Sequence, residues 1–340
     1  MKAVVLVGGE GTRLRPLTET MPKPLVPLMD RPSLDHVLDH LARHGVHHVV
    51  LSSSYLEEPF RTFIERRHGD PAITWITETE PLGTGGAIVN ALEALESDEP
   101  FLALNGDILT DLDLSAMVAL HRERGSVATI ALTHVDDARP YGLVPMAENG
   151  RVLEFREKPA DLVPGDINAG TYALEPSALE GWPVGENVSI ERQIFPSLIE
   201  AGRPLYGYLS DAYWTDLGTP EAYLQAHFDL LDGRVRGEPT YPAPFVQSGG
   251  VHEAALRGRH VVAAQGVYVA ATATVQDSVL MEAASVEHAA VVRRSIVGWN
   301  AFIHSGAEVV DSVLGKGAVV LDGAEVVGAR VGAGEQVPAP

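Results

Sequence analysis

The C-terminal part of the chain repeats itself with a period of 17 residues. The segments SVLMEAASV, SIVGWNAFI and SVLGKGAVV begin at residues 278, 295 and 312, and a weaker copy, ARVGAG, begins at 329. Small aliphatic residues recur about every six positions within each copy. A fixed period predicts a parallel solenoid, because each copy can bury its apolar side chains only against its neighbours. Strict phasing with three short strands per period favours a parallel β-helix over a β-sandwich.

The first two-thirds of the chain has a different pattern, in which strand-like and helix-like segments alternate. We expect strands over 3–7, 47–53, 101–107 and 126–135, and helices over 33–45, 115–125 and 219–233, with Ser33 as an N-cap and Pro220 at a first helical position. Such alternation predicts an α/β fold with a parallel sheet and helices on both faces. Ligands of these sheets bind beyond the carboxyl ends of the strands.

Between these two patterns lies a stretch rich in proline and glycine that has no periodicity. The sequence therefore predicts a domain over 1–233, a linker over 234–260 and a β-helix over 261–340. The repeat resembles the hexapeptide arrays that form left-handed parallel β-helices. A solenoid flank also offers a surface for homo-oligomer formation.

Composition excludes several classes of function. A formal net charge of −21 argues against nucleic acid and anionic membranes as partners, because both require a basic surface. The chain has no cysteine, which excludes disulfides, zinc-thiolate sites and thiol nucleophiles. The apolar run at the N-terminus is too short for a signal peptide or a membrane span, so we expect a cytoplasmic protein.

Positive charge is concentrated behind the first expected strand. The chain has only four lysines, yet Lys23 lies close to Arg13 and Arg15 in a glycine-rich stretch, GGEGTRLRPLT…PKP. This stretch lacks the Gly-Lys-Ser/Thr of a Walker A loop, and Leu14 replaces the third glycine of a dinucleotide fingerprint. Glycines nevertheless expose backbone N–H groups to phosphate oxygens, and an arginine can bind two such oxygens at once.

The complete string GGEGTRLRPLT…PKPLVPL resembles the signature of the sugar-nucleotide pyrophosphorylases, which are nucleotidyltransferases acting on sugar 1-phosphates. The resemblance covers nearly the whole chain and implies a Rossmann-like catalytic domain followed by the β-helix. It implies that Arg13 and Lys23 hold the triphosphate and stabilise charge during transfer. The other nucleotide-binding residues implied in this loop are Gly8, Gly9, Gly11 and Thr12.

Two aspartates are candidates for a metal site. Asp107 follows the expected strand FLALN, and Asp216 lies in YWTDLGTP. From the residues alone, an aspartate at a strand end can equally cap a turn. Phosphoryl chemistry, however, requires a carboxylate to hold Mg²⁺. The resemblance assigns Asp107 and Asp216 to Mg²⁺, with Asp107 catalytic, and places Asn105 and Gly106 beside the nucleotide.

The segments EKP and INAGTY match the motifs that bind the sugar phosphate in this family. Glu157 is suited to accept hydrogen bonds from sugar hydroxyls, and Lys158 to bind the phosphate. Asn168 and Gly170 allow a close approach, and Gly142 completes the implied sugar-phosphate site. The alternative is a surface Glu–Lys pair in front of a proline.

The segment TETEPLGTGGAI resembles the part that reads the nucleobase. Glu80 stands where thymidylyl and uridylyl relatives tend to have glutamine, and Gly83 belongs to the same loop. A carboxylate can accept both donors of a guanine edge but would face carbonyl oxygens in uracil or thymine, so Glu80 favours GTP. Glu78 is an alternative reader. Gly85 replaces the alanine of mannose-1-phosphate guanylyltransferases and is frequent in heptose-1-phosphate guanylyltransferases, which leaves the sugar open.

The expected reaction is Mg²⁺-dependent guanylyl transfer from GTP to a sugar 1-phosphate, with mannose 1-phosphate favoured. Four alternatives remain at this stage. The enzyme could be a glucose-1-phosphate thymidylyl- or uridylyltransferase, or a heptose-1-phosphate guanylyltransferase. The β-helix could be an acyltransferase that uses His288 or His304 as a base. A non-catalytic regulatory paralogue is the fourth, although a chain that only binds has no need of every motif residue.

Overall fold

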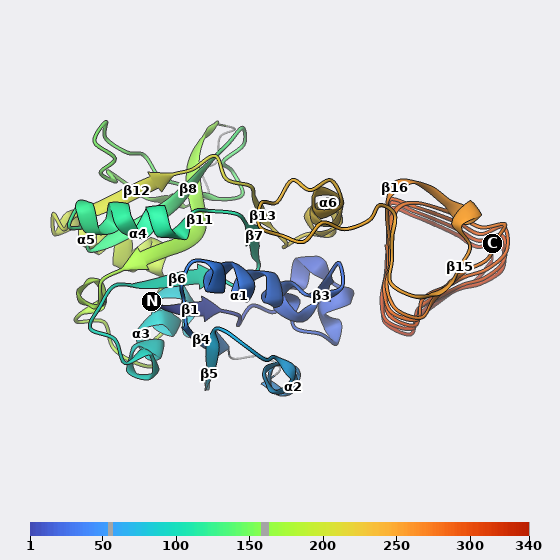
Figure 1. Ribbon diagram of the computed structural model, residues 1–340, viewed down its shortest axis with the longest axis horizontal. Helices are drawn as coiled ribbons and strands as arrows, with labels where there is room; N and C mark the ends of the chain where they lie inside the picture. Colours follow the sequence, from blue (N-terminus) through green and yellow to red (C-terminus); the bar gives the residue numbers. More distant parts are fainter. Residues whose placement is uncertain (54–56, 158–162, 340) are drawn as a thin grey trace. The chain divides into compact units, whose positions relative to one another are not determined.

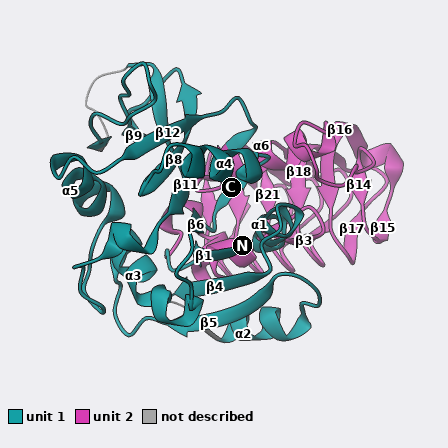
Figure 2. Cartoon of the chain, turned by 60° about the vertical axis from the view of Figure 1, so that its left-hand side comes forward, with its two compact units in different colours: residues 1–9, 34–214 teal, residues 10–33, 215–340 magenta. Residues whose placement is uncertain are grey.

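The fold is taken from a computed structural model that describes residues 1–53, 57–157 and 163–339. The chain forms two compact units (Figure 2). The sheet unit consists of residues 1–9 and 34–214, and the solenoid unit of residues 10–33 and 215–340. The segment 10–33, which carries most of the glycine-rich signature, therefore packs with the C-terminal part of the chain.

The sheet unit is built on a mixed sheet whose strand order is β10-β9-β11-β6-β1-β4-β5; β8 pairs with β11, and β12 pairs with β8 (Figure 1). Its strands are β1 (Lys2–Leu6), β4 (His48–Ser53), β5 (Ala72–Thr77), β6 (Phe101–Asn105), β8 (Ala128–Val135), β9 (Gly142–Leu143), β10 (Arg156–Glu157), β11 (Gly165–Leu174) and β12 (Leu205–Leu209). Strand β1 is parallel to both β4 and β6, whereas β11 is antiparallel to β6 and β8. The α/β fold class is confirmed, and the antiparallel half of the sheet adds to the expected parallel half.

Two helices of this region, over 33–43 and 114–123, follow the expected segments 33–45 and 115–125 closely, whereas those over 57–66, 83–95 and 195–200 were not expected. The helices are α1 (Ser33–Arg43), α2 (Glu57–Arg66), α3 (Gly83–Leu95), α4 (Leu114–Glu123) and α5 (Phe195–Glu200), with short turns η4 (Pro176–Leu179) and the π-helix η5 (Ile190–Ile194). Asp113 caps α4 by accepting a hydrogen bond from Ala116 N at 2.9 Å. The expectation that Ser33 is an N-cap was wrong, since Ser33 is the first residue of α1 and its hydroxyl donates to Pro24 O at 2.9 Å. None of the helices in the described residues is long and apolar enough to cross a membrane.

The solenoid unit begins with short elements and one long helix. These are η1 (Thr12–Leu14), η2 (Leu17–Glu19), η3 (Lys23–Leu25), the hairpin strands β2 (Pro27–Leu28) and β3 (Arg31–Pro32), and α6 (Pro220–Leu231). Thr219 caps α6 by accepting from Ala222 N at 3.2 Å, and Pro220 takes the first helical position as expected. Strand β7 (Ile108–Thr110) lies in the sheet unit, and β13 (Trp214–Asp216) leads into α6.

The remaining strands form an all-parallel β-helix with three flat faces, seen end-on in Figure 1. One face consists of β15 (Gly249–Val251), β17 (Val267–Val269), β19 (Ser285–Val286), β22 (Phe302–Ile303), β25 (Val319–Val320) and β28 (Gln336–Val337). The other two faces share the strands β14 (Phe245–Val246), β16 (Leu256–Ala263) and β18 (Thr274–Leu280), and η6 (Glu253–Ala255) precedes β16. From β18 onward, one of these faces continues as β20 (Val291–Arg293), β23 (Glu308–Val310) and β26 (Glu325–Val327). The other continues as β21 (Ile296–Val297), β24 (Val313–Leu314) and β27 (Arg330–Val331). The arrangement is consistent with the expected left-handed form, and its first strands lie within the range expected as a linker.

The 17-residue period has a direct structural cause. Ser278, Ser295 and Ser312 are buried one above another, and each hydroxyl donates to a carbonyl two residues earlier in its own coil at 2.7 Å. Each hydroxyl also accepts from the backbone N–H 17 residues later, at 3.1 Å. Each of these three coils is thus bonded to the next at the same corner, and the polar groups of that corner are satisfied.

Candidate functional site

In the sheet unit, two signature loops leave the same edge of the sheet. Strands β1 and β6 are parallel with Leu6 opposite Asn105, so the loop beginning at Gly8 and the loop beginning at Gly106 emerge side by side. Gly106 N donates to Leu6 O at 2.9 Å. A Cβ at position 106 would lie 2.7 Å from Val7 Cγ1, which is too close for any residue but glycine. Gly106 therefore lets the chain carry Asp107 past the end of β1.

The NGD and NAG motifs meet directly. Gly170 has φ +69°, and a Cβ there would lie 2.7 Å from Asn105 Nδ2. Gly170 N donates to Asn168 Oδ1 at 2.9 Å, which fixes the turn of the NAG motif. Residues expected to contact the nucleotide and residues expected to contact the sugar phosphate are therefore neighbours, although they are about 60 positions apart in the sequence.

The other expected sugar-phosphate residues lie on adjacent strands. Gly142 in β9 pairs with Glu157 in β10, and β9 also pairs with β11, the strand that carries Asn168. Trp214 Nε1 donates to Ala169 O at 2.9 Å and so braces the NAG turn. The side chain of Glu157 and the whole of Lys158 lie outside the described residues.

The two glutamates considered as base readers have different environments. Glu78 is 8% exposed, and its carboxylate accepts from Ser52 Oγ at 2.8 Å and from Leu82 N at 3.1 Å. These bonds join the end of β4 to the start of α3, so Glu78 is engaged in the fold. Glu80 is exposed, as a group that reads a ligand must be.

The glycines of PLGTGG are required by packing against the π-helix η5. Gly85 N and Gly86 N both donate to Val188 O, at 2.8 and 2.9 Å. A Cβ at Gly85 would lie 2.8 Å from Ile194 Cδ1 and 2.9 Å from Ile190 N. Gly83 has φ +68°, a left-handed conformation that favours glycine. The glycine at position 85 is therefore explained by helix packing.

Sequence reasoning missed Glu191, which connects three of these segments. Glu191 Oε2 accepts from Thr84 Oγ1 at 2.7 Å and from Ser189 Oγ at 2.8 Å, and Tyr172 Oη lies 3.4 Å from Oε1. Thr84 belongs to PLGTGG and Tyr172 to INAGTY. No local pattern marks Glu191, because its bonds to Thr84 and Tyr172 reach other parts of the chain.

In the solenoid unit, the side chains of three separate motifs meet, because Arg13 and Lys23 both donate to the carboxylate of Asp216. Lys23 Nζ donates to Asp216 Oδ1 at 3.1 Å, and Arg13 Nη2 donates to Asp216 Oδ2 at 3.2 Å. The Lys23 side chain is only 8% exposed, whereas that of Arg13 is 63% exposed. A Cβ at Gly218 would lie 2.5 Å from Arg13 Nη2, so the glycine of WTDLG leaves room for the guanidinium.

The loop that carries Arg13 is shaped by its own glycine. Gly11 has φ +61°, and a Cβ there would lie 3.0 Å from Lys23 Cβ and from Thr18 Cγ2. Thr18 Oγ1 donates to Gly11 O at 2.8 Å. Thr12 begins the following turn and is exposed. The residues of this segment that are expected to bind the triphosphate thus lie around a close-packed backbone turn. Two of them, Arg13 and Lys23, share the negative charge of Asp216.

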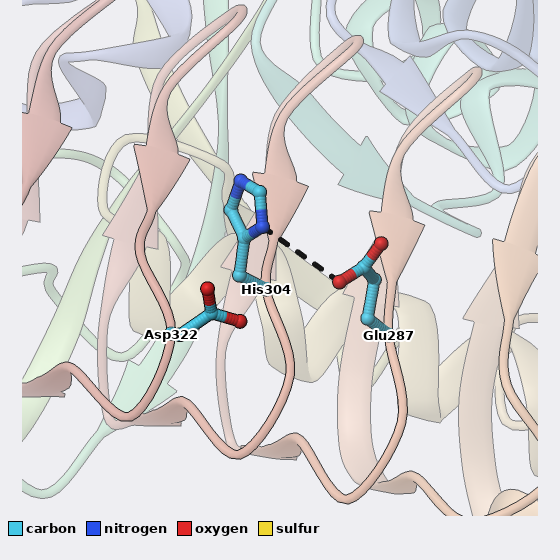
Figure 3. Close-up of side chains that lie close together, drawn as sticks. All are labelled: Glu287, His304 and Asp322. Carbon is cyan, nitrogen blue, oxygen red and sulfur yellow. Dashed lines mark ion pairs between the residues drawn. The ribbon is translucent and has the colours of Figure 1, made fainter.

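Of the two histidines of the acyltransferase alternative, His304 lies on the outside of the β-helix (Figure 3), and His288 is exposed. His304 Nδ1 is 3.7 Å from Glu287 Oε2 on the preceding coil, and Asp322 lies on the following coil with its carboxylate within 4.8 Å of both. His288 Nδ1 lies 3.1 Å from Thr272 Oγ1. Both rings therefore interact with neighbouring coils at a solenoid surface.

Comparison with known proteins agrees with these motifs. The nucleotidyl transferase family matches residues 2–233, and the GMPPB C-terminal domain family matches residues 244–338. The mannose-1-phosphate guanylyltransferase of Mycobacterium tuberculosis is 42% identical over 237 residues, which cover 68% of this chain and 65% of that protein. The probable mannose-1-phosphate guanylyltransferase 3 of rice, Oryza sativa subsp. japonica, is 37% identical over 84% of this chain and 81% of its own length.

Among solved structures, HddC from Yersinia pseudotuberculosis, determined as a complex with GMP-PN, is 31% identical with a TM-score of 0.59. The match covers 67% of this chain and 98% of HddC. The aligned region thus spans just under two-thirds of the mycobacterial relative and nearly all of HddC. On the family match over most of its length, this chain belongs to the nucleotidyl transferase family, and it is similar in sequence to proteins of the mannose-1-phosphate guanylyltransferase type.

Proposed function

We propose that this protein transfers a guanylyl group from GTP to mannose 1-phosphate, releasing pyrophosphate and forming GDP-mannose. The observation that supports the reaction type most directly is the convergence of Arg13, Lys23 and Asp216, which places two phosphate-binding cations on one carboxylate. Similarity to mannose-1-phosphate guanylyltransferases supports the choice of substrates.

In this proposal a phosphate oxygen of the sugar 1-phosphate attacks the α-phosphorus of GTP, and pyrophosphate leaves on the opposite side. The attacking phosphate is already ionised, so no general base is needed, and positioning with charge stabilisation supplies the catalysis. Arg13 is exposed enough to bind a triphosphate, and Lys23 supplies a fixed buried charge beside it.

We assign Mg²⁺ to Asp107 and Asp216 on the chemistry of the donors present. Each oxygen of Asp216 accepts one hydrogen bond in the described contacts, and a carboxylate oxygen has two acceptor sites, so the carboxylate fits a cation in addition. Asp107 is a half-buried carboxylate directly after the β6 strand end. Bound Mg²⁺ would neutralise negative charge on the phosphates.

Glu80 is the proposed guanine reader, and the exposed position of Glu80 beside the engaged Glu78 favours this choice. A carboxylate accepts from both guanine donors, so Glu80→Gln should lower the preference for GTP over UTP by about tenfold, the usual consequence of losing one good hydrogen bond to a charged group. An unchanged ratio would place base recognition elsewhere.

The test is pyrophosphate release with Mg²⁺, using GTP, UTP, dTTP and ATP separately against mannose, glucose and heptose 1-phosphates. Release with GTP and mannose 1-phosphate is the expected result. Release only with a pyrimidine triphosphate would overturn the assignment of Glu80, and release with heptose 1-phosphate alone would overturn the sugar. Absence of release in every combination would favour the regulatory paralogue.

A further inference from the structure

On the β-helix, side chains at one aligned strand position form a column that runs from coil to coil. The members of this column are aliphatic except the last, which is an arginine. Paired strands align Val262 with Val279, then Ile296, Val313 and finally Arg330. The four aliphatic members are at most 6% exposed, yet the residues that follow each of Val279, Ile296 and Val313 form the interior core. Because side chains alternate along a strand, the aliphatic column faces outward and is covered from outside.

Helix α6 and the β2–β3 hairpin supply this cover. Val262 and Val279 line a small cavity together with Met29, Tyr223 and His227. Farther along, Ile296 and Val313 line a groove with Pro220 and Leu224, at the N-terminal end of α6. The helix thus follows the column from coil to coil and begins beside the coil that contains Val313. Beyond this point the column no longer faces an apolar helix.

Arg330 occupies the next position of the column, and there its partner is the glycine-rich signature. Arg330 Nη1 donates to Arg13 O at 2.7 Å and to Arg15 O at 3.2 Å. These two carbonyls flank Leu14 in the turn η1 that carries the Arg13 side chain. A second contact joins the same surfaces, since Ala333 N donates to Glu19 Oε2 at 3.3 Å.

We propose that Arg330 is a positioning residue, through which the last coil of the β-helix holds the signature turn in the conformation that presents Arg13 to the triphosphate. The inference rests on the proposed function for the identity of the ligand. Its physical basis is that an unheld loop must be ordered when the ligand binds, and this ordering weakens binding. A guanidinium is suited to the task because it can bond two carbonyls at once with fixed geometry.

The first measurement tests how firmly the turn is held in the folded protein and does not depend on catalysis. Hydrogen–deuterium exchange of a peptide covering residues 10–20 is compared in the wild type, Arg330→Ala and the control Arg293→Ala. Arg293 is also a partly exposed strand arginine of the solenoid, and it pairs with Glu308 on the next coil at 3.9 Å. We expect faster exchange at 10–20 in Arg330→Ala alone. Equal exchange in the three proteins would overturn the inference.

The second measurement reads ligand binding and turnover. Arg330→Ala should raise the KM for GTP and the calorimetric Kd for GTP with Mg²⁺ about five- to tenfold, corresponding to one or two lost hydrogen bonds, while the KM for mannose 1-phosphate stays within twofold. Arg330→Lys retains a donor that can reach one carbonyl, so its values should lie between those of the wild type and Arg330→Ala. A Kd and KM for GTP unchanged in Arg330→Ala would contradict the proposal.

The two measurements separate failure of this inference from failure of the proposed function. If the wild type neither binds GTP nor releases pyrophosphate but exchange at 10–20 still rises in Arg330→Ala, the contact is correct and the substrate assignment is wrong. If the wild type is active with GTP and Arg330→Ala is unchanged in exchange and in the KM for GTP, the positioning role is wrong and the function stands. A melting temperature equal to that of Arg293→Ala serves as the control for folding.

Discussion

Both compact units contain parallel strands, but they connect them in different ways. In the sheet unit, Leu6 lies opposite Ser52 on one side and Asn105 on the other, so neighbouring strands come from distant parts of the chain. In the repeated coils of the β-helix, strands pair with strands 17 residues later, as Ile296 does with Val313. The sheet therefore gathers unlike residues at one edge, whereas the solenoid repeats one environment. A solenoid position acquires an individual role only where the repeat is broken, as it is at Arg330.

The largest expected effect tests whether a strand-end carboxylate of the sheet unit has a unique role. Asp107→Asn should lower the rate of pyrophosphate release at least about 100-fold, because an amide lacks the charge that a divalent cation requires. The melting temperature should change little. Asp322→Asn, an exposed carboxylate on the β-helix, is the matched control and should retain activity. Near-normal turnover in Asp107→Asn would remove this residue from the proposed metal site.

A second variant tests close packing at the same sheet edge. Gly106→Ala should lower the free energy of unfolding by about 2 kcal/mol, because its Cβ meets Val7 Cγ1 at 2.7 Å and Leu6 O at 3.0 Å. Gly125→Ala is the control, since a Cβ there meets nothing within 4 Å and only the positive φ of +55° is unfavourable. Chemical denaturation measures both. A smaller loss for Gly106→Ala than for Gly125→Ala would contradict the packing argument.

The third prediction concerns the repeated environment of the solenoid. Ser295→Ala should cost about 1.5 kcal/mol of unfolding free energy, because Ser312 N loses its buried acceptor. The same change at Ser278 should cost a similar amount, since its hydroxyl accepts from Ser295 N in the same geometry. Urea denaturation of the two variants provides the test. Markedly unequal losses would show that the coils are not equivalent.

The smallest expected effect is a pH dependence of the sheet unit. Burial and, to a smaller extent, the nearby Arg122 lower the pKa of His121 to about 4, although Glu175 Oε1 lies 3.6 Å from its Nε2. The unfolded chain therefore binds a proton that the folded state excludes, and stability falls as the pH drops below about 6.5. The loss should be about 1 kcal/mol between pH 6.5 and 5.5. His121→Gln, which removes the titrating group beside Thr129, should flatten this dependence; an unaltered slope would assign the effect to other groups.

The sequence was most informative where local rules or a fixed period determine the structure. The 17-residue spacing predicted the β-helix and the number of residues in each coil, since Ser295 N donates to the hydroxyl of Ser278, 17 residues earlier. The Asp107 and Asp216 motifs were located correctly at a strand end and before a helix, while their proposed roles remain predictions.

Long-range contacts were not predictable from the sequence alone. Glu191 lies in a segment without a recognisable pattern, and its bond to Thr84 spans 107 residues. The contact of Arg330 with Arg13 spans 317 residues, and nothing in the weak last repeat indicated a partner. The grouping of residues 10–33 with the solenoid unit likewise depends on packing against α6, which no local propensity specifies.

The register of the outward column has a consequence for how the chain can change length. A serine-containing coil can be inserted or removed without disturbing the corner, because the coils of Ser278, Ser295 and Ser312 offer the same donors and acceptors to the next. Each such change would, however, move Arg330 by one strand spacing, about 4.8 Å, relative to the first coil beside α6. The two carbonyls that it reaches belong to the turn whose Arg13 side chain bonds Asp216, a residue that precedes the first residue of α6. Coil number is therefore a geometric variable tied to the signature loop.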